Sequence, residues 1–163
     1  MDANLIAECA DLLYREGRHL DDNDWDAWLA LFTEDCWWHI PMWVNEYEVT
    51  TNPQRELSLM WYPNRTGLED RVYRIRTGAS SASTPIPRTV HAISNVSVEA
   101  KENDEYQVRS VGVVSSYRHK NHDEFYCRYE HALRRTEAGL KICGKRTIVS
   151  NDLIPDIIDI YSV

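Results

Sequence analysis

The sequence has 163 residues, 43% of them apolar, which is enough for one domain (residues 1–163) to bury a core without disulfide or metal staples. Its 18 Lys and Arg and 26 Asp and Glu give a formal net charge of −8. This charge excludes nucleic-acid binders that track phosphates and polybasic membrane-surface proteins, because both need a concentrated positive field.

Two helices are predicted in the first third of the chain. Apolar residues recur at helical spacing over residues 5–13, and this helix is expected to end near Gly17. A second helix is expected to have Asn23 as its N-cap and an apolar stripe over residues 25–32. The two stripes indicate that the helices pack against each other.

The middle of the chain is predicted to contain strands and one helix. Residues 36–44 are rich in aromatic side chains and contain Pro41, which favours an edge strand because proline cannot donate to a β-ladder. Residues 57–62 fit a short strand or a helical turn, and residues 67–77 fit a third helix. The segment 77–88, rich in Ser, Thr and Pro, is expected to be a flexible loop.

Apolar and polar residues alternate after residue 88. Residues 96–100 predict a strand that turns at residues 102–104, and a change of phase near Ser110 predicts a bulge in the next strand. Two further long strands complete an antiparallel meander. Helices followed by strands predict an α+β domain in which the helices cover one face of a curved antiparallel sheet.

The cysteines and the N-terminus indicate a reducing compartment. No basic and apolar leader is present, and no run approaches the roughly 18 apolar residues of a membrane span. We therefore expect a cytoplasmic protein without membrane association. Its four cysteines, none in a CxxC pair, are expected to be buried thiols: Cys9, Cys36, Cys127 and Cys143.

Histidines are the first candidates for metal ligands. Residues 119–123 (HKNHD) offer two imidazoles and a carboxylate, as in a non-haem iron site, but they fall in a predicted hairpin turn, where a polar run is usually solvated. Residues 36–39 (CWWH) have the CxxH spacing of half a Rieske cluster, and the sequence has no CxH partner. His131 lies on an apolar strand face and is expected to be a hydrogen-bonded core residue. We predict no metal site in this chain.

A concave sheet with buried imidazoles could still support acid–base catalysis. The residues considered for such a pocket are His39 and His91 with Asp22 or Asp35, because burial and a carboxylate partner tune an imidazole towards neutral pH. Serine-based catalysis has no support, since no GxSxG motif is present, and no phosphate-binding P-loop occurs.

Blocks spread along the whole chain carry a family resemblance. They are 13–16 (LYRE), 20–22 (LDD), 25–29 (WDAWL), 53–62 (PQRELSLMWY), 64–72 (NRTGLEDRV), 88–91 (RTVH) with 94–95 (SN), and 151–161 (NDLIPDIIDIY). In their order and spacing these blocks resemble the small (beta) subunit of Rieske-type aromatic-ring-hydroxylating dioxygenases, most closely the benzoate, toluate and anthranilate branch.

The resemblance implies a cystatin-like α+β cone related to nuclear transport factor 2, in agreement with the predicted elements. It also implies a hexamer of three large and three small subunits. In such enzymes the large subunit holds the Rieske [2Fe-2S] cluster and a mononuclear iron, and electrons arrive from NADH through a reductase. The implied reaction converts an aromatic carboxylate to a cis-diol, or to a catechol where an ortho group leaves. This chain would then carry no cofactor and no catalytic residue, and would support assembly of the large subunit.

Some residues outside the amphipathic stripes are candidates for subunit contacts. Trp43 and Trp61 are predicted interface anchors, with a position in the core as the alternative for each. Asp152 is expected to bond the backbone of residues 153–155 or to pair with an arginine.

A polar group near the start of a predicted strand has two interpretations. Arg88, His91 and Asn95 either form a hydrogen-bonding cluster that fixes the strand or meet the large subunit. The competing functions are a stand-alone enzyme similar to scytalone dehydratase or polyketide cyclases, using His39 or His91, and a small-molecule-binding protein of the same fold.

Overall fold

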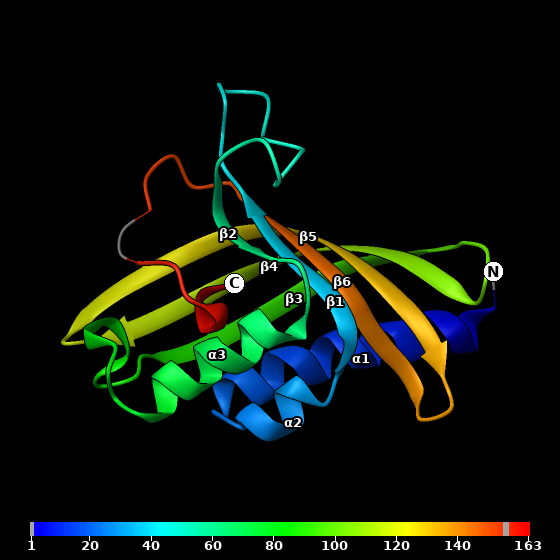
Figure 1. The fold of residues 1–163 in the computed structure, drawn as a ribbon, viewed down its shortest axis with the longest axis horizontal. Helices are drawn as coiled ribbons and strands as arrows, with labels where there is room; N and C mark the ends of the chain where they lie inside the picture. Colours follow the sequence, from blue (N-terminus) through cyan, green and yellow to red (C-terminus); the bar gives the residue numbers. More distant parts are fainter. Residues whose placement is uncertain (1, 155–156) are drawn as a thin grey trace.

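Two layers make up the fold in the computed structural model, which describes residues 2–154 and 157–163 (Figure 1). One layer holds the helices α1 (Ala3–Asp21), α2 (Trp25–Leu29) and α3 (Arg65–Arg76). The other is a curved sheet of the strands β1 (Phe32–Pro41), β2 (Ser58–Tyr62), β3 (Arg88–Ala100), β4 (Glu105–Arg118), β5 (Asn121–Thr136) and β6 (Gly139–Val149). The short 3₁₀ helices are η1 (Ser81–Ser83) and η2 (Ile160–Ser162). The predicted α+β domain, with helices on one face of a curved sheet, is confirmed.

The strands of the sheet lie in the order β2-β1-β6-β5-β4-β3. Strands β3 to β6 form the antiparallel meander that the alternation predicts, and β2 is antiparallel to β1. Strand β1, however, runs parallel to β6, so the sheet is mixed and the prediction of an antiparallel sheet is wrong at this pairing. The reason is that β6 ends the meander with one side unpaired, and β1 covers that side.

The core lies between the helices and the concave face of the sheet. Trp28 of α2 is fully buried, and the ring centroids of Phe32 and Trp38 lie 4.9 and 5.8 Å from its own. Each large apolar side chain that is fully buried contributes roughly 1.5–3 kcal/mol. Other fully buried residues of this core are Leu12, Leu13, Leu20, Leu68, Leu133, Ile142 and Ile160.

The first helix is longer than predicted. It continues through Gly17 to Asp21, because Gly17 faces β3, where an added Cβ would lie 3.0 Å from the Cβ of His91. Glycine at this position permits a close approach of helix and sheet and does not end the helix. The third helix, predicted over residues 67–77, is confirmed as α3.

The second helix is shorter than predicted and has a different cap. Asn23 precedes the cap with a φ of 56°, and the carboxylate of Asp24 accepts the hydrogen bond of the Ala27 amide at 3.2 Å. The helix ends at Leu29, since Phe32 already belongs to β1. The apolar spacing continues across the boundary because both elements contribute to one core.

Strand β1 lies inside the sheet, so the prediction of an edge strand is wrong. It pairs with β2 on one side and β6 on the other. Pro41 is tolerated because it is the last residue of the strand, where the register with β2 shifts. The edge strand is β2, which confirms the strand alternative for residues 57–62.

The irregularity expected in β4 lies on the neighbouring strand. Val108 and Ser110 of β4 are both buried on one face, so the phase of β4 does not change there. The register shifts between Ser94 and Ser97 of β3, and Asn95 between them has a φ of 55°. A bulge on β3 therefore bends the outer part of the sheet.

No helix in the two described ranges is long and apolar enough to cross a membrane.

Candidate functional site

Charged and polar side chains meet in the interior between α1 and the sheet. Lys145 Nζ of β6 donates a hydrogen bond to Glu16 Oε1 of α1 at 2.7 Å, and His131 Nε2 of β5 lies 2.9 Å from Glu16 Oε2. The three side chains are 1–3% exposed. Lys145 Nζ also lies 4.7 and 4.9 Å from the ring centroids of Trp38 and Tyr129, so two aromatic faces help to stabilise its charge. We call Glu16, His131 and Lys145 the interior cluster.

The protonation of the interior cluster follows from its contacts. Burial alone would raise the pKa of Glu16, but Lys145 and His131 outweigh burial and lower this pKa to about 2. Burial lowers the pKa of His131, and the neighbouring Glu16 opposes this shift only in part. At neutral pH the cluster is therefore an ion pair of Glu16 and Lys145, with a neutral His131 that donates from Nε2 to the carboxylate.

The interior cluster has residue types suited to acid–base chemistry but no room for a substrate. The cavity that it lines, together with His91 and Tyr129, has a volume of about 10 Å³. That is about the volume that one water molecule requires, whereas a cavity that binds benzene measures on the order of 150 Å³. The centre of the cone is packed, and its polar groups act on one another.

His91 is fixed by Asp21 at the start of β3. Its Nδ1 lies 2.6 Å from Asp21 Oδ1, and its backbone amide donates to Asp21 Oδ2 at 3.0 Å. Thr89 Oγ1 donates to the same carboxylate at 2.9 Å. Burial raises the pKa of Asp21, but the hydrogen bonds from His91 and Thr89 outweigh burial and lower it. Asp21, the last residue of α1, thereby holds the first residues of β3. The sequence prediction named the neighbouring Asp22 and not Asp21, and only as an acid–base partner.

His39 occupies a different part of the sheet. Its Nε2 lies 3.0 Å from Ser58 Oγ in a hydrogen bond, and its ring meets Trp61 edge-on with 5.6 Å between centroids. Burial lowers the pKa of His39, and the nearby Arg146 lowers it further. This imidazole is a buried, neutral link between β1 and β2.

The four residues considered for an acid–base pocket do not converge. His39 lies on β1 and His91 on β3, with β6, β5 and β4 between them in the sheet. Asp22 is exposed at the end of α1. The Asp35 side chain is 62% exposed and accepts two hydrogen bonds from Arg134. The structure thus places these candidates at separate locations.

The two tryptophans predicted as interface anchors are both half-buried. Trp43 Nε1 donates to the carbonyl of Val149 at 2.8 Å, which ties the segment after β1 to the end of β6. Trp61 packs against His39 on the edge strand. Part of each tryptophan side chain is therefore buried within the subunit, and the rest is exposed for contact with a partner.

The remaining predicted residues lie on the surface. Arg88 is exposed at the start of β3, and Asn95 is exposed at the bulge, so neither joins the pair of His91 with Asp21. Asp152 is exposed just after β6. Its expected bond to the backbone of residues 153–155 extends to residue 155, which lies outside the described residues.

Two interior contacts were not predicted from the sequence. Glu16 lies four residues after Leu12, so it continues the apolar stripe of α1, and a charged residue in such a position signals a buried partner. Arg71 forms a bidentate ion pair with Asp159, at 2.8 and 2.6 Å. Arg71 and Asp159 both lie within the sequence blocks that carry the family resemblance, and this was the one feature of the sequence that singled them out.

The donor set does not fit a metal or a Rieske cluster. In residues 2–154 and 157–163, no three His, Cys, Asp or Glu side chains come close enough together to hold a metal ion. Burial raises the pKa of Cys36 to about 12 and the pKa values of Cys9 and Cys127 to about 11, so these thiols are protonated. Metal ligation needs the thiolate.

Comparison with known proteins decides the family. The ring hydroxylating beta subunit family matches residues 15–156. The chain belongs to this family. The benzoate 1,2-dioxygenase subunit beta of Acinetobacter baylyi is 38% identical to it over 163 residues, covering 100% of this chain and 96% of the relative. The toluate 1,2-dioxygenase subunit beta of Pseudomonas putida is 39% identical over 153 residues, covering 94% of each. The anthranilate 1,2-dioxygenase small subunit of Acinetobacter baylyi is 36% identical over 163 residues, covering all of both chains.

Solved structures agree with the assignment to the beta subunit family. The beta subunit of the benzoate 1,2-dioxygenase from Burkholderia mallei has a TM-score of 0.81 and 37% identity, covering 100% of this chain and 98% of that chain. A protein with a cystatin-like fold from Nostoc punctiforme has a TM-score of 0.66 at 15% identity, covering 95% and 97%, which shows the fold alone. The beta subunit is thus part of an oxidoreductase and has the cystatin-like fold that the sequence resemblance implies.

Proposed function

We propose that this beta subunit supports a dioxygenase whose substrate is an aromatic carboxylate of the benzoate, toluate or anthranilate kind. The observation that carries the proposal is the identity of 36–39% to three small subunits named for such substrates, over 94–100% of this chain. The reaction would add both atoms of dioxygen to the ring, with NADH and a proton supplying the two electrons and two protons, to give a cis-diol. Where an ortho substituent leaves together with the carboxylate, which departs as carbon dioxide, the product would be a catechol.

The redox groups of the proposed complex belong to its large subunit. That subunit would hold the Rieske [2Fe-2S] cluster and the mononuclear iron, and a reductase would deliver electrons from NADH. This chain offers protonated, buried cysteines and no metal-binding cluster among its described residues, so none of the steps is assigned to its side chains. Its cytoplasmic location, expected from the sequence, accords with a supply of NADH.

Assembly is the role that remains for the beta subunit. We infer a hexamer of three large and three small subunits, in which the small subunits also contact one another. The packed interior supports this role, because a cavity of about 10 Å³ does not accommodate an aromatic acid. The same observation disfavours the alternative of a stand-alone dehydratase, cyclase or small-molecule-binding protein.

Coexpression with the large subunit tests the proposal. The large chain is recognised by its paired CxH and CxxH motifs, and the two chains are purified through a tag on the small subunit alone. We expect copurification in equal amounts and iron in the complex. Once NADH and the reductase are added, we expect oxygen uptake with benzoate that exceeds uptake with benzene. A small subunit that purifies without the large chain would overturn the proposal.

A further inference from the structure

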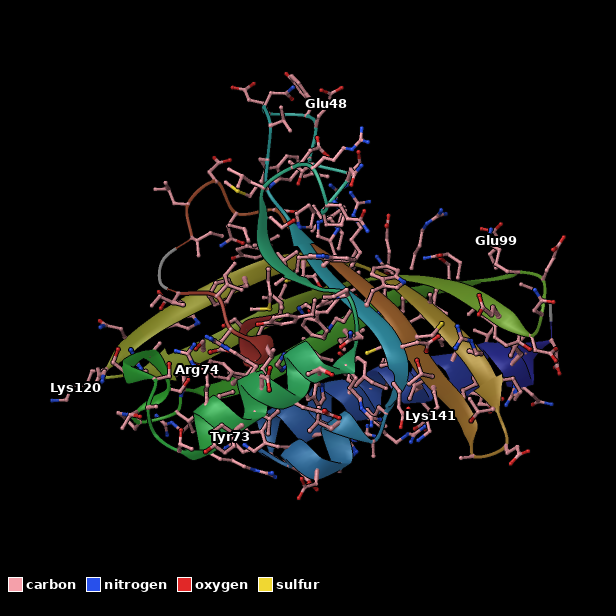
Figure 2. All side chains as sticks on the ribbon, in the orientation of Figure 1. Glu48, Tyr73, Arg74, Glu99, Lys120 and Lys141 are labelled. Carbon is pink, nitrogen blue, oxygen red and sulfur yellow. The ribbon has the colours of Figure 1, made fainter. Side chains whose placement is uncertain are left out.

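A rigid arm projects from the end of the sheet between β1 and β2. The arm comprises residues 43–57, and Figure 2 shows Glu48 near its tip, away from both layers. Its turn is closed by Asn45, whose Oδ1 accepts the amides of Tyr47 and Glu48 at 2.8 and 3.0 Å. The carboxylate of Glu56 accepts two further backbone amides of the arm. These bonds fix the arm in advance, which lowers the entropy cost of docking it onto a partner.

The arm exposes apolar side chains that the subunit itself does not cover. Tyr47 is 87% exposed, Leu57 76% and Val44 61%. Acidic side chains, Glu46 and Glu48, flank Tyr47 on either side in the sequence. An aromatic tip between two carboxylates, on a rigid support, has the composition of an interface anchor.

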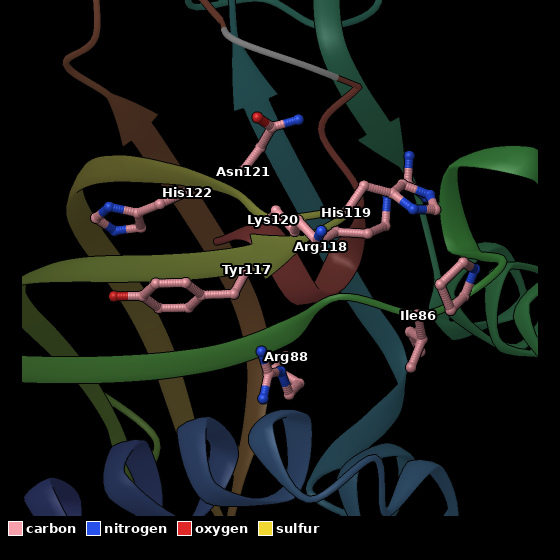
Figure 3. Close-up of a pocket in the computed structure, with 9 residues that line it drawn as sticks. Ile86, Arg88, Tyr117, Arg118, His119, Lys120, Asn121 and His122 are labelled. Carbon is pink, nitrogen blue, oxygen red and sulfur yellow. The ribbon is translucent and has the colours of Figure 1, made fainter.

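A basic pocket lies at the turn between β4 and β5 (Figure 3). It has a volume of about 440 Å³ and is lined by residues 85, 86, 88 and 117–122. Arg88, Arg118 and Lys120 bring three permanent positive charges to this pocket, in a chain whose net charge is −8. Glu124, 3.4 Å from His122, offsets part of this charge.

The walls of the basic pocket suit an aromatic side chain. Tyr117 and His122 are stacked, with 4.5 Å between ring centroids and 7° between planes. Arg118 donates to the carbonyl of Ser81 at 3.1 Å, which joins the β4–β5 turn to the segment before β3. Flat rings and guanidinium groups are the surfaces on which tyrosine packs well.

We propose that the arm of one beta subunit docks in the basic pocket of the next beta subunit. The inference rests on the proposed function, in which small subunits associate within the complex. Charge complementarity supports it, because the arm carries Glu46 and Glu48 beside Tyr47, whereas the pocket carries Arg88 and Lys120. In the docked state Tyr47 would enter the pocket between these charges. Arm and pocket are separate surfaces of one subunit, as the positions of Glu48 and Lys120 in Figure 2 show. Such a contact is head-to-tail, and head-to-tail contacts close into rings such as a trimer.

Two single substitutions test the docking. Tyr47→Ala removes the anchor, and Tyr73→Ala, at a tyrosine 71% exposed on α3, is the matched control. Loss of an aromatic anchor at the centre of an interface weakens association by about 30-fold. Mass measurement of the complex with the large subunit should show three of each chain for wild type and for Tyr73→Ala, and smaller assemblies for Tyr47→Ala.

A charge exchange identifies the partner of the arm. Glu46→Lys and Lys120→Glu should each weaken association, and the double variant should restore it. Glu102→Lys, which makes the same charge change on the exposed turn between β3 and β4, should have no effect. Restoration in the double variant requires that an arm and a pocket of this chain meet.

The outcomes separate the docking from the proposed function. If every variant forms the wild-type hexamer, the docking is wrong while the proposed function stands. If Tyr47→Ala keeps the small subunits together but loses the large chain, the arm binds the large subunit and the docking is again wrong. If wild type never binds the large chain, the proposed function fails, and sedimentation of the small subunit alone decides the docking: a monomer at all concentrations, or an oligomer that Tyr47→Ala leaves intact, overturns it.

Discussion

Arg71 and Asp159 join α3 to the C-terminal segment through two parallel hydrogen bonds, Nε to Oδ1 at 2.8 Å and Nη2 to Oδ2 at 2.6 Å. The Asp159 side chain is fully buried and Arg71 is 17% exposed. Asp159 also accepts the backbone amide of Ile160 at 2.7 Å. This pair sets the path by which the chain end enters the core, where Ile160 and Val163 are fully buried (Figure 1).

Arg71→Ala should destabilise the subunit by about 3–5 kcal/mol, because it leaves the carboxylate of Asp159 buried and unpaired. Urea unfolding measures the loss. Arg76→Ala is the control, since its ion pair with Asp26 has side chains 47% and 82% exposed and should contribute less than about 1 kcal/mol. Equal losses in the two variants would contradict the structural role of the buried pair.

Acid should unfold the subunit through Glu16. The pKa of this carboxyl is about 2 in the folded state against an ordinary value of 4.5, so the unfolded chain binds the proton first as the pH falls. The stabilisation, about 3 kcal/mol, is present above pH 4.5 and is lost between pH 4.5 and 2. Urea unfolding over this pH range measures the slope, which Glu16→Gln should flatten. An unchanged slope in Glu16→Gln would contradict the ion pair with Lys145.

Histidines should add a second pH dependence above that range. Burial lowers the pKa of His131 and of His39 below the ordinary value of 6.5, so the unfolded chain takes up protons that the folded chain does not. Stability should therefore decline as the pH falls below 6.5. His131→Gln should reduce the slope between pH 6.5 and 5 relative to wild type. The measurement is the urea midpoint at each pH.

Gly144→Ala should destabilise the sheet by about 1–3 kcal/mol, since the added methyl would overlap a packed ring. The Cβ of an alanine would lie 2.2 Å from Cε2 of Trp37, which covers this position from the neighbouring strand β1. Thermal unfolding measures the loss. Trp37→Leu should relieve the overlap, so the double variant should be more stable than the sum of the two single losses predicts. Simple additivity would show that the ring does not cover the glycine.

Much of the fold follows from local sequence signals. The apolar stripe of α1 and the alternation in β3 to β6 reflect which side chains face one core, so their periods identify the elements directly. The ends of elements depend on tertiary contacts instead. Glycine often ends a helix, but Gly17 lies inside α1, because β3 packs closely against the helix at this position.

Contacts between segments far apart in the chain could not be predicted from local sequence patterns. Glu16 and Lys145 are 129 residues apart, and neither spacing nor composition says that they meet. The same holds for the parallel pairing of β1 with β6, which depends on where the chain returns after the helices. The family resemblance did predict the cystatin-like cone and the beta subunit family, because the order and spacing of the sequence blocks carry information on the whole fold.

Turnover by the assembled complex tests most directly whether this subunit acts through assembly and not through interior chemistry. Glu16→Gln with Lys145→Met removes both charges of the interior cluster while a glutamine can still accept from His131, and Glu16→Gln alone serves if the pair does not fold. Turnover per iron and the product formed should stay within about threefold of wild type in the intact complex. A fall of about 100-fold or more, the typical size of a lost acid or base, in a complex of unchanged mass would contradict it.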